Sequence, residues 1–367
     1  MEILELEGDY FEGGGQILRT SLTLSAILKK PFKITKIRAN RKNPGLAPQH
    51  LTCVKAMEKI TGGKSIGNTL GSTELEFSPG EIRGGNYSFD VSETKGSAGS
   101  ISLLAQTIIL PLAFAKEESS VQLKGGTHVS WSPIVDYISN VFVPLLEKMG
   151  ANCEITLRKA GFYPLGGGEI ELKIRPVKEL TAINIETRGE LKEITGVSAV
   201  SKLTMAIAKR QKLEMLRAIA SDKGVKIQPK LEEKEMQADC PGTFCFICAK
   251  YENTIAGFSS LGEVSKKAEQ VGREAAEHFI KFNNSNNSLD EHLQDQILIP
   301  AALSNGETAF QTEKLSSHAK TNIYVIKKFI PELEIDEREE KLAGTEKTII
   351  KVKIKGANIR GSLAESN

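Results

Sequence analysis

Apolar residues recur every three or four positions in pairs of segments, which is the spacing of amphipathic helices. Three such pairs are present, at residues 16–29 and 47–61, 99–115 and 132–149, and 290–304 and 318–330. Segments with strand-like alternation of apolar and polar residues follow each pair, at 72–80, 151–174 and 346–356. The simplest interpretation is a unit of two helices and a four-stranded sheet used three times, because one unit cannot bury both its helix face and its sheet face alone.

Residues 185–275 do not fit this pattern. They contain a long helical run at 198–224 and two strand-like segments, so we interpret them as a small inserted α/β domain. Residues 1–184 and 276–367 are then expected to form one large domain of three repeated units. The sequence therefore predicts a mixed α/β (α+β) fold with two domains.

The amino-acid composition limits the kinds of partner that the protein is expected to bind. The chain has 367 residues, with 48 Lys and Arg against 46 Asp and Glu, so a nucleic-acid site must be a local patch and not a generally basic surface. No apolar run is long enough to cross a bilayer, and the first ten residues lack the basic and apolar regions of a secretory signal. We expect a cytoplasmic protein without a membrane partner.

Three of the five cysteines cluster, at Cys240, Cys245 and Cys248. This spacing is compatible with an iron–sulfur or zinc site, but a fourth ligand is not evident nearby. The same segment is typical of a buried strand, in which free cysteines are common. We favour the buried strand.

The stretch FEGGGQILRT, residues 11–20, places three glycines directly before a predicted helix. Bare backbone lets N–H groups approach an anion, and the helix N-terminus adds a partial positive charge, so phosphate is a natural ligand. A tight turn explains the glycines nearly as well, because neither the Walker lysine nor the Rossmann spacing is present. Glu12, Gln16 and Arg19 flank the run.

The next polar cluster surrounds a Pro-Gly turn and contains Arg38, Arg41, Lys42, Gln49 and His50. Arginine forks suit phosphate oxygens, and three cations this close together repel one another unless they are solvated or bind an anion. A solvated basic loop is the alternative. Because Arg19 adds to the concentration of cations, we favour a polyphosphate or RNA-end site.

Two further segments carry polar groups in apolar surroundings. Gln106 lies on the apolar face of a predicted helix, and a buried amide must find partners in a ligand or in the backbone. His128, Trp131 and Pro133 follow in one loop, which is either a wall for base stacking or a packed turn.

His318 follows Ser316 and Ser317, either of which can cap the predicted helix. The positive end of a helix favours the neutral imidazole, whose free lone pair permits nucleophilic attack. Lone histidines are more often structural, so the pattern alone leaves catalysis open. His292 and Asp295 begin another helix, where they would either meet ribose or metal or simply cap the helix.

Seven segments, taken in order, resemble the RNA 3'-terminal phosphate cyclases over about residues 8–331. They are EGGGQILRTSLTLS, IRANRKNPGLAPQHL, KGSAGSISLLAQT, GGTHVSWSP, GFYPLGGGE, EHLQDQILIP and SSHAKTNI. The resemblance implies ATP-dependent conversion of an RNA 3'-terminal phosphate to a 2',3'-cyclic phosphate, through an adenylyl-histidine and an RNA-adenylate, with release of AMP and pyrophosphate. It also implies three units similar to the C-terminal domain of translation initiation factor three, interrupted by a small α/β insert.

The resemblance assigns a role to each candidate residue. His318 would be the nucleophile through Nε2, and Glu12 would bind Mg²⁺ or Mn²⁺ beside the nucleotide phosphates. The residues expected to hold phosphates or the RNA 3'-phosphate end are Gln16, Arg19, Arg38, Arg41, Gln49 and His50. Those expected to bind ATP are Gln106, Pro133, His292, Leu293, Gln294, Asp295 and Gln296. In this family an aromatic ring often occupies the position of His292 and stacks on adenine opposite the proline matched by Pro133.

Two other functions share this architecture. Cyclase-like ribosome-assembly proteins lack the histidine and do not cyclise RNA, and enolpyruvyl transferases act on small phosphorylated metabolites. His318 in SSHAKTN argues against both, since neither function uses it. The sequence leaves open the RNA substrates, the tolerance of DNA ends, the preference for ATP over GTP, and the oligomeric state.

Overall fold

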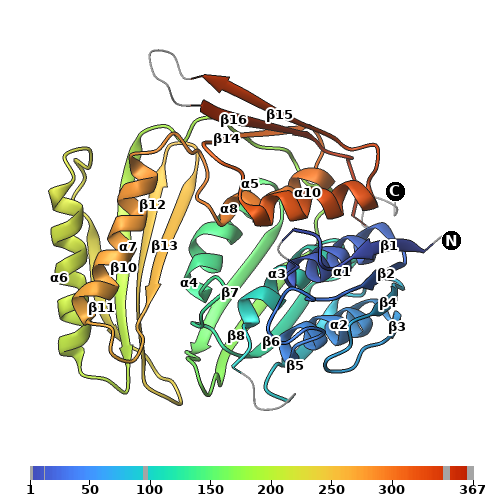
Figure 1. The fold of residues 1–367 in the computed structure, drawn as a ribbon, viewed down its shortest axis with the longest axis horizontal. Coiled ribbons are helices and arrows are strands. Elements are labelled where there is room, and N and C mark those ends of the chain that lie inside the picture. The colour runs from blue at the N-terminus through green and yellow to red at the C-terminus, as the bar shows by residue number, and fades with distance from the viewer. Residues whose placement is uncertain (1–2, 12, 94–97, 342–347, 362–367) are drawn as a thin grey trace.

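The computed structural model describes residues 3–11, 13–93, 98–341 and 348–361 (Figure 1). Within these residues the strands form four sheets of four strands each. The prediction of a mixed α+β fold is confirmed. Every helix in the described part of the chain is too short or too polar to span a lipid bilayer.

The first unit begins the chain. Its elements are β1 (Leu4–Glu7), α1 (Gln16–Leu28), β2 (Phe32–Thr35), α2 (Pro48–Thr61), β3 (Lys64–Ile66) and β4 (Leu75–Ser78). The sheet order is β1-β2-β4-β3, with β1 and β2 parallel and the other pairs antiparallel. Helix α2 starts at a proline, whose missing N–H costs nothing in the first turn.

The second unit repeats this order. Its elements are β5 (Gly85–Asp90), α3 (Ile101–Ala113), β6 (Ser119–Gly125), α4 (Val135–Tyr137), the π-helical turn η1 (Ile138–Phe142), α5 (Val143–Lys148), β7 (Asn152–Lys159) and β8 (Gly168–Arg175), in the sheet order β5-β6-β8-β7. The single helix expected at 132–149 is divided in three. Pro144 cannot donate a backbone hydrogen bond to the turn before it, and the chain widens into the π turn there.

The third unit is interrupted after its first strand. It consists of β9 (Asn184–Ile185), α8 (Leu293–Gln296), α9 (Leu298–Leu303), β14 (Glu307–Thr312), α10 (Ser317–Phe329), β15 (Glu334–Lys341) and β16 (Thr348–Lys355). Its sheet order β9-β14-β16-β15, with only the first pair parallel, is that of the other two units. The predicted threefold use of one unit is therefore visible in the strand connections.

The insert has its own sheet and core. It contains β10 (Leu191–Ser201), α6 (Met205–Ser221), β11 (Lys230–Glu235), β12 (Gly242–Tyr251), β13 (Ile255–Leu261) and α7 (Ala268–Asn283), in the sheet order β11-β10-β12-β13. Met215 and Phe279 of the two helices pack on one face of the sheet, and its other face meets the core of the repeated units. The domain boundaries at 185 and 275 stay a prediction, and α7 continues past the second of them.

One expectation for the insert was wrong. The helical run predicted at 198–224 begins with the end of a strand, because residues 198–201 pair with β12 on one side of β10 and Ser198–Val200 pair with β11 on the other. Helix α6 starts only at Met205, after Thr204 caps it by accepting a hydrogen bond from the N–H of Ala206 at 3.4 Å. Sheet pairing on both sides outweighs the local helical pattern.

The clustered cysteines are structural. Cys240, Cys245 and Cys248 are all buried and free, and burial raises the pKa of Cys245 to about 12 and that of Cys248 to about 11. Cys245 faces the core of the insert, whereas Cys248 faces the core of the repeated units on the opposite side of β12. Two thiols on opposite faces of one sheet do not share a metal ion.

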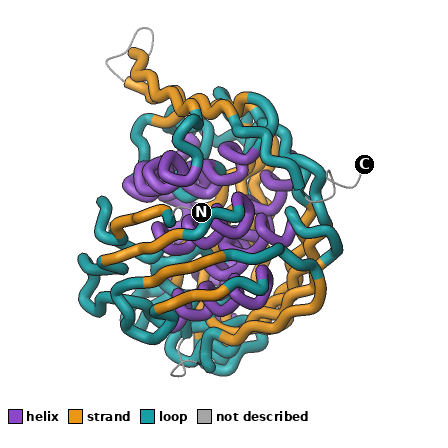
Figure 2. Tube along the Cα trace, turned by 90° about the vertical axis from the view of Figure 1, so that its right-hand side faces the viewer, coloured by secondary structure: helices purple, strands orange, loops and turns teal. Residues whose placement is uncertain are grey.

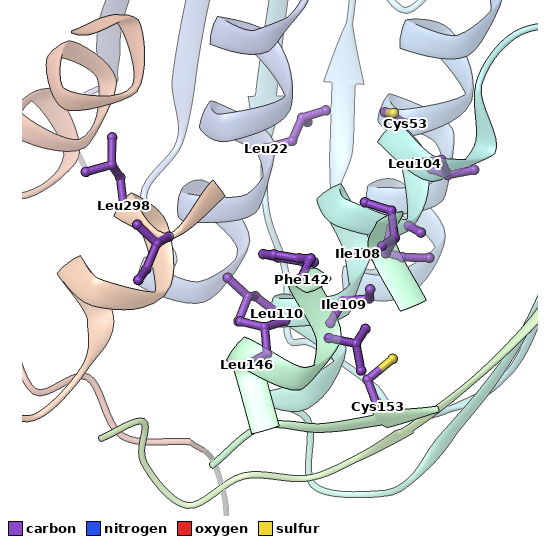
Figure 3. Packing of buried hydrophobic residues seen from close by; sticks show 14 of the residues in the cluster. Leu22, Cys53, Leu104, Ile108, Ile109, Leu110, Phe142, Leu146, Cys153 and Leu298 are labelled. Carbon is purple, nitrogen blue, oxygen red and sulfur yellow. The ribbon is translucent and has the colours of Figure 1, made fainter. Parts of the chain in front are cut away.

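The helices of the repeated units lie between the sheets, as Figure 2 shows. Side chains from all three units meet in their common core, among them Leu22 of α1, Ile108 of α3, Phe142 of η1 and Leu298 of α9 (Figure 3). Each fully buried side chain of this kind stabilises the fold by about 1.5–3 kcal/mol. This shared core fixes the helices relative to one another and thereby positions their ends.

Candidate active site

Helices α1 and α10 pack against each other, and two hydrogen bonds show that they run in the same direction. In their second turns, the hydroxyl of Thr20 donates a hydrogen bond to Oδ1 of Asn322 at 2.6 Å. Beyond the end of α1, Nζ of Lys30 donates to the carbonyl of Phe329 at 2.7 Å, at the end of α10. The N-termini of the two helices are therefore at the same end of the pair.

Helices α2 and α3 join this arrangement. Oε1 of Gln49, in the first turn of α2, accepts a hydrogen bond from the N–H of Ser100, the residue that caps α3, at 3.0 Å. Further along, Sγ of Cys53 lies 3.8 Å from Oγ1 of Thr107, and Thr23 of α1 donates to the carbonyl of Thr107 at 2.9 Å. Four helix N-termini thus open toward one region, and each adds a partial positive charge that favours anions.

Asp295 lies where α1, α8 and α10 meet. Its Oδ2 accepts a hydrogen bond from Nε2 of Gln16 at 2.6 Å, and its carbonyl accepts one from Nδ2 of Asn322 at 2.8 Å. Burial raises the pKa of Asp295, and the neighbouring His318 and Arg19 act in the opposite direction. The structure therefore brings together four residues that the sequence singled out separately, from three distant segments.

His318 is the second residue of α10 and its side chain is exposed. The hydroxyl of Ser316 caps the helix by accepting a hydrogen bond from the N–H of Ala319 at 3.0 Å, so of the two serines predicted to cap it, Ser316 does so. Gln294 holds this cap in place: its Oε1 accepts from the N–H of Ser316 at 3.4 Å and its Nε2 donates to Thr312 at 2.8 Å. The imidazole is thus presented to solvent from a firmly held helix start.

Arg19 extends from α1 into the same region. Burial lowers the pKa of Arg19, and Cys53 and Asp295 act in the opposite direction, but a guanidinium remains charged in proteins. Arg19 and Arg38 both lie close enough to His50 to help lower the pKa of His50. Arg19 and Arg38 therefore both lie near His50, the residue against which Gly15 packs.

The glycine run is packed against the basic loop. An added Cβ on Gly15 would lie 1.8 Å from Nε2 of His50, and one on Gly14 would lie 3.1 Å from a terminal nitrogen of Arg41. Gly13 has φ 56°, a conformation that non-glycine residues seldom adopt. The three glycines therefore permit a turn at Gly13, the close approach of the Arg41 guanidinium to Gly14, and the close approach of the His50 imidazole to Gly15.

Arg38 and Arg41 differ in their surroundings. Arg38 is half-buried and donates a hydrogen bond to the carbonyl of Gly45 at 2.8 Å. Burial lowers the pKa of Arg38, and the nearby Arg41 adds to this effect. Arg41 and Lys42 are exposed at the loop surface. The positive charges of the two guanidinium groups repel each other, so binding of an anion between them is favourable.

His50 is buried, and its Nδ1 has no hydrogen-bond partner among the described residues. Burial lowers the pKa of His50 well below its ordinary value, and the charges of Arg19 and Arg38 add to the effect. The imidazole is therefore neutral at physiological pH. The imidazole packs against Gly15 and forms one wall of the candidate site.

The state of His50 predicts a pH dependence of folding. Unfolded histidine titrates near pH 6.5, so below this pH the unfolded chain binds a proton that the folded chain excludes. The free energy of unfolding should consequently fall as the pH is lowered, by up to about 1.4 kcal/mol per pH unit for this one proton. Urea unfolding of the wild type and of His50→Gln between about pH 7 and pH 5 measures the effect. The variant should show the shallower slope, and equal slopes would contradict the assignment.

Two amides near the site lack partners. Nε2 of Gln106 on α3 and Oε1 of Gln296 on α8 are buried without a hydrogen-bond partner in the described part of the chain. Leaving such an atom unsatisfied costs about 1–3 kcal/mol. A bound ligand that pairs with them would recover this free energy. The side chain of Leu293, the first residue of α8, is fully buried in the core and packs there.

Tyr137 of α4 contacts His292, the residue before α8. The exposed ring of His292 lies edge-on to the ring of Tyr137, with the centroids 6.0 Å apart, and the half-buried Pro133 precedes α4. His128 of the same loop is buried and bonded to Thr127 and Asp136, each at 2.7 Å. The loop is therefore packed at His128, whereas its Trp131 is 97% exposed.

Sequence reasoning missed Asp290, which holds these elements together. Its carboxylate is buried and accepts hydrogen bonds from the hydroxyl of Tyr137 at 2.7 Å, from the N–H groups of His292 and Leu293, both at 3.0 Å, and from the N–H of Gly257 at 3.1 Å. An aspartate just before a predicted helix was the available signal. Asn322 was missed as well, and its partners on α1 and α8 gave no local signal.

The metal-binding prediction is not decided by the geometry. Glu12 lies outside the described residues, and the described ones include no group of three or more His, Cys, Asp or Glu side chains that could hold a metal ion.

Comparisons with known proteins give the family. A family model described as RNA 3'-terminal phosphate cyclase matches residues 10–333. The RNA 3'-terminal phosphate cyclase of Nostoc punctiforme is 43% identical over 344 residues, which are 92% of this chain and 97% of that protein. The one of Ignicoccus hospitalis is 41% identical over 338 residues, covering 91% of this chain and 94% of that protein.

Among solved structures, an EPSP synthase from Acinetobacter baumannii aligns with 96% of this chain and 65% of its own at 15% identity and a TM-score of 0.28, a likeness too weak to carry an argument. The family match and the curated relatives agree with the seven ordered segments and with the repeated fold. The chain belongs to the RNA 3'-terminal phosphate cyclase family.

Proposed function

We propose that this protein converts an RNA 3'-terminal phosphate to a 2',3'-cyclic phosphate in three steps, using ATP and releasing AMP and pyrophosphate. One observation carries the proposal: His318 stands at the positive end of α10, beside Asp295 and Arg19, where the N-termini of α1, α2 and α3 also open. A nucleophile and a field that favours phosphate therefore occupy one place.

In the first step, Nε2 of His318 attacks the α-phosphorus of ATP. A P–N bond forms, the bond to the β-phosphate oxygen breaks, and pyrophosphate leaves. Asp295 is suited to orient and stabilise the imidazole as it gains positive charge. Arg19 and the helix N-termini offset the negative charge that develops on the phosphates.

In the second step, an oxygen of the RNA 3'-phosphate attacks the same phosphorus, and His318 leaves. In the third, the adjacent 2'-hydroxyl attacks the 3'-phosphorus, the bond to AMP breaks, and the hydroxyl proton passes to solvent or a base. Arg38, Arg41 and Gln49 are the groups assigned to hold the RNA end, since they border the glycine run and the N-terminus of α3.

The nucleotide is assigned to the region between α3, α4 and α8. His292 and Pro133 are assigned to face the two sides of an adenine, and Gln106 and Gln296 each supply a polar atom that has no partner among the described residues. Leu293 and Gln294 support this segment from the interior. Mg²⁺ is expected to bind mainly through ATP phosphates and water, with Glu12 as its protein ligand. A cytoplasmic location also stays a prediction.

The function is tested with a synthetic RNA that carries a 3'-phosphate. Incubation with ATP should render the phosphate resistant to phosphatase and release one AMP and one pyrophosphate for each end that is cyclised. A ribosome-assembly protein would leave the end unchanged, and the curated relatives that bear the cyclase name do not favour that alternative. An end that stays phosphatase-sensitive while the protein is folded would refute the proposal.

Charge reversal at Arg41 should impair the use of RNA ends. Arg41 is exposed beside Gly14, and a hydrogen bond to a charged phosphate contributes about 1.5–3 kcal/mol. Arg41→Glu is therefore expected to lower kcat/KM for 3'-phosphorylated RNA by about 10- to 100-fold. Arg83→Glu is the matched control, because Arg83 is exposed near Gly62 at the opposite end of α2. Equal turnover by the two variants would remove Arg41 from the site.

A further inference from the structure

A groove runs along the outer face of α10, beginning next to the candidate active site. It has a volume of about 480 Å³, and its lining includes Tyr10, Lys320, Tyr324, Lys327 and Lys328, with Glu337 of β15 on the facing side. Lys320 lies two residues beyond His318 on the same helix. Residues two apart on a helix point to different sides, so the groove and His318 share the first turn of α10 but not one face of it.

Aromatic rings form a ladder along this groove. The ring of Phe11 lies edge-on to that of Tyr10 with centroids 4.7 Å apart, and Tyr10 stacks on Tyr324 at 3.8 Å. Phe11 is 55% exposed and Tyr10 is 38% exposed, so both offer ring surface to solvent. Phe11 also has φ 52°, a conformation that bulky residues rarely adopt. The ladder starts two residues before the glycine run and leads away from it along α10.

The groove is positively charged within a nearly neutral protein. Among the described residues, no ion pair involves Lys320, Lys327 or Lys328, although Nζ of Lys328 lies 5.8 Å from the centroid of the Tyr324 ring. The acidic residues close to Tyr324 are engaged elsewhere, because Glu7 and Asp9 both pair with Lys36, at 3.1 and 3.4 Å. Glu337 is the one carboxylate of the lining.

The spacing fits an extended strand. Lys320 and Lys328 are eight residues apart on α10, which corresponds to about 12 Å along the helix axis. Lys327 and Lys328 lie about two turns from Lys320 and on the same exposed side. Cations at this separation beside stacked rings match the alternation of phosphates and bases in a single strand.

We propose that this groove binds the single-stranded RNA nucleotides that precede the 3'-phosphate. Bases stack on the exposed rings of Phe11 and Tyr10, and backbone phosphates contact Lys327 and Lys328. A positive groove with aromatic platforms binds single strands with little sequence preference, so the enzyme would accept many different RNA ends. The inference rests on the proposed function and adds the path of its substrate.

Fluorescence anisotropy with a labelled single-stranded RNA of about ten nucleotides that ends in a 3'-phosphate tests the groove. Lys327→Gln/Lys328→Gln should raise the Kd about tenfold and reduce the slope of log Kd against log salt by about 1.4, which is the loss of two phosphate contacts on a single strand. Tyr10→Leu should also raise the Kd about tenfold, whereas Tyr10→Phe should restore the wild-type value because the ring remains.

The matched control is Lys209→Gln/Lys223→Gln, which removes two exposed lysines from the insert. Its Kd and salt slope should equal those of the wild type. If the groove variant has the same Kd and salt slope as this control, the proposal is overturned. It is also overturned if the groove variant changes only the oligomeric state in sedimentation, because the groove then joins two copies of the chain. AMP transfer from ATP without RNA is measured on the same samples. A wild type that forms no adduct refutes the proposed function, while the anisotropy still decides the groove.

Discussion

His318→Ala is expected to abolish covalent transfer of AMP from ATP to the protein and to lower cyclisation by roughly 10⁴-fold or more. The reason is chemical, since the imidazole of His318 supplies the nitrogen that is assigned to form the P–N bond. The exposed imidazole contributes little packing, so the free energy of unfolding should change by less than about 0.5 kcal/mol. The measurement is incubation with α-labelled ATP, followed by mass mapping of the labelled peptide.

His278→Ala is the matched control, because His278 is an exposed histidine on α7, in the insert. It should retain the wild-type amount of adduct. The adduct on the wild type should be labile in acid and stable in alkali, as expected for a phosphoramidate. A labelled peptide that does not contain His318, or an adduct that survives in His318→Ala, would show that another residue is the nucleophile.

Gly15→Ala adds one methyl group, and we expect it to be among the most destabilising additions of this size in the protein. The new Cβ would lie 1.8 Å from Nε2 of the buried His50, so the imidazole or the backbone must shift. Overpacking of this kind costs about 1–3 kcal/mol, which urea unfolding measures. Because α1 and α2 would have to move apart at their N-termini, we also expect a loss of about 10²-fold in activity.

A double variant separates the clash from other effects of the alanine. Gly15→Ala/His50→Ala makes room for the methyl group, so its free energy of unfolding should exceed the value expected if the two single effects were additive. Gly14→Ala is the control for stability, because its Cβ would meet only the far end of the exposed Arg41, at 3.1 Å. Strict additivity in the double variant would show that the contact between Gly15 and His50 is not the cause.

The three repeated units share one arrangement of helices and sheet, and this shared arrangement positions the candidate site. Each unit packs its helices inward and its sheet outward, so the helices of different units touch one another in the shared core. Helices that pack in the same direction bring their N-termini to one place, as the contacts of Thr20 with Asn322 and of Gln49 with Ser100 demonstrate. This convergence of helix N-termini supports the proposed site for phosphates.

The sequence alone determined the elements that depend on local spacing. The apolar periodicity located α1, α2, α3 and α10, Ser316 was among the predicted caps of α10, and the glycine run was recognised as the start of a helix. Where sheet pairing competed with the local apolar spacing, the prediction from the spacing was wrong. Residues 198–201 had a helical pattern, but pairing with two neighbouring strands made them part of β10.

Only the tertiary structure decided which of these elements meet. The bond between Gln16 and Asp295 spans 279 positions of the chain, and that between Thr20 and Asn322 spans 302, so neither is encoded in a local pattern. The same holds for His50 against Gly15, for the bonds of Asp290 with Tyr137 and Gly257, and for Tyr10 stacked on Tyr324. Periodicity states which face of a helix is buried, but the neighbour of that face is selected by close packing of the whole core, where side chains from all units must fit at once.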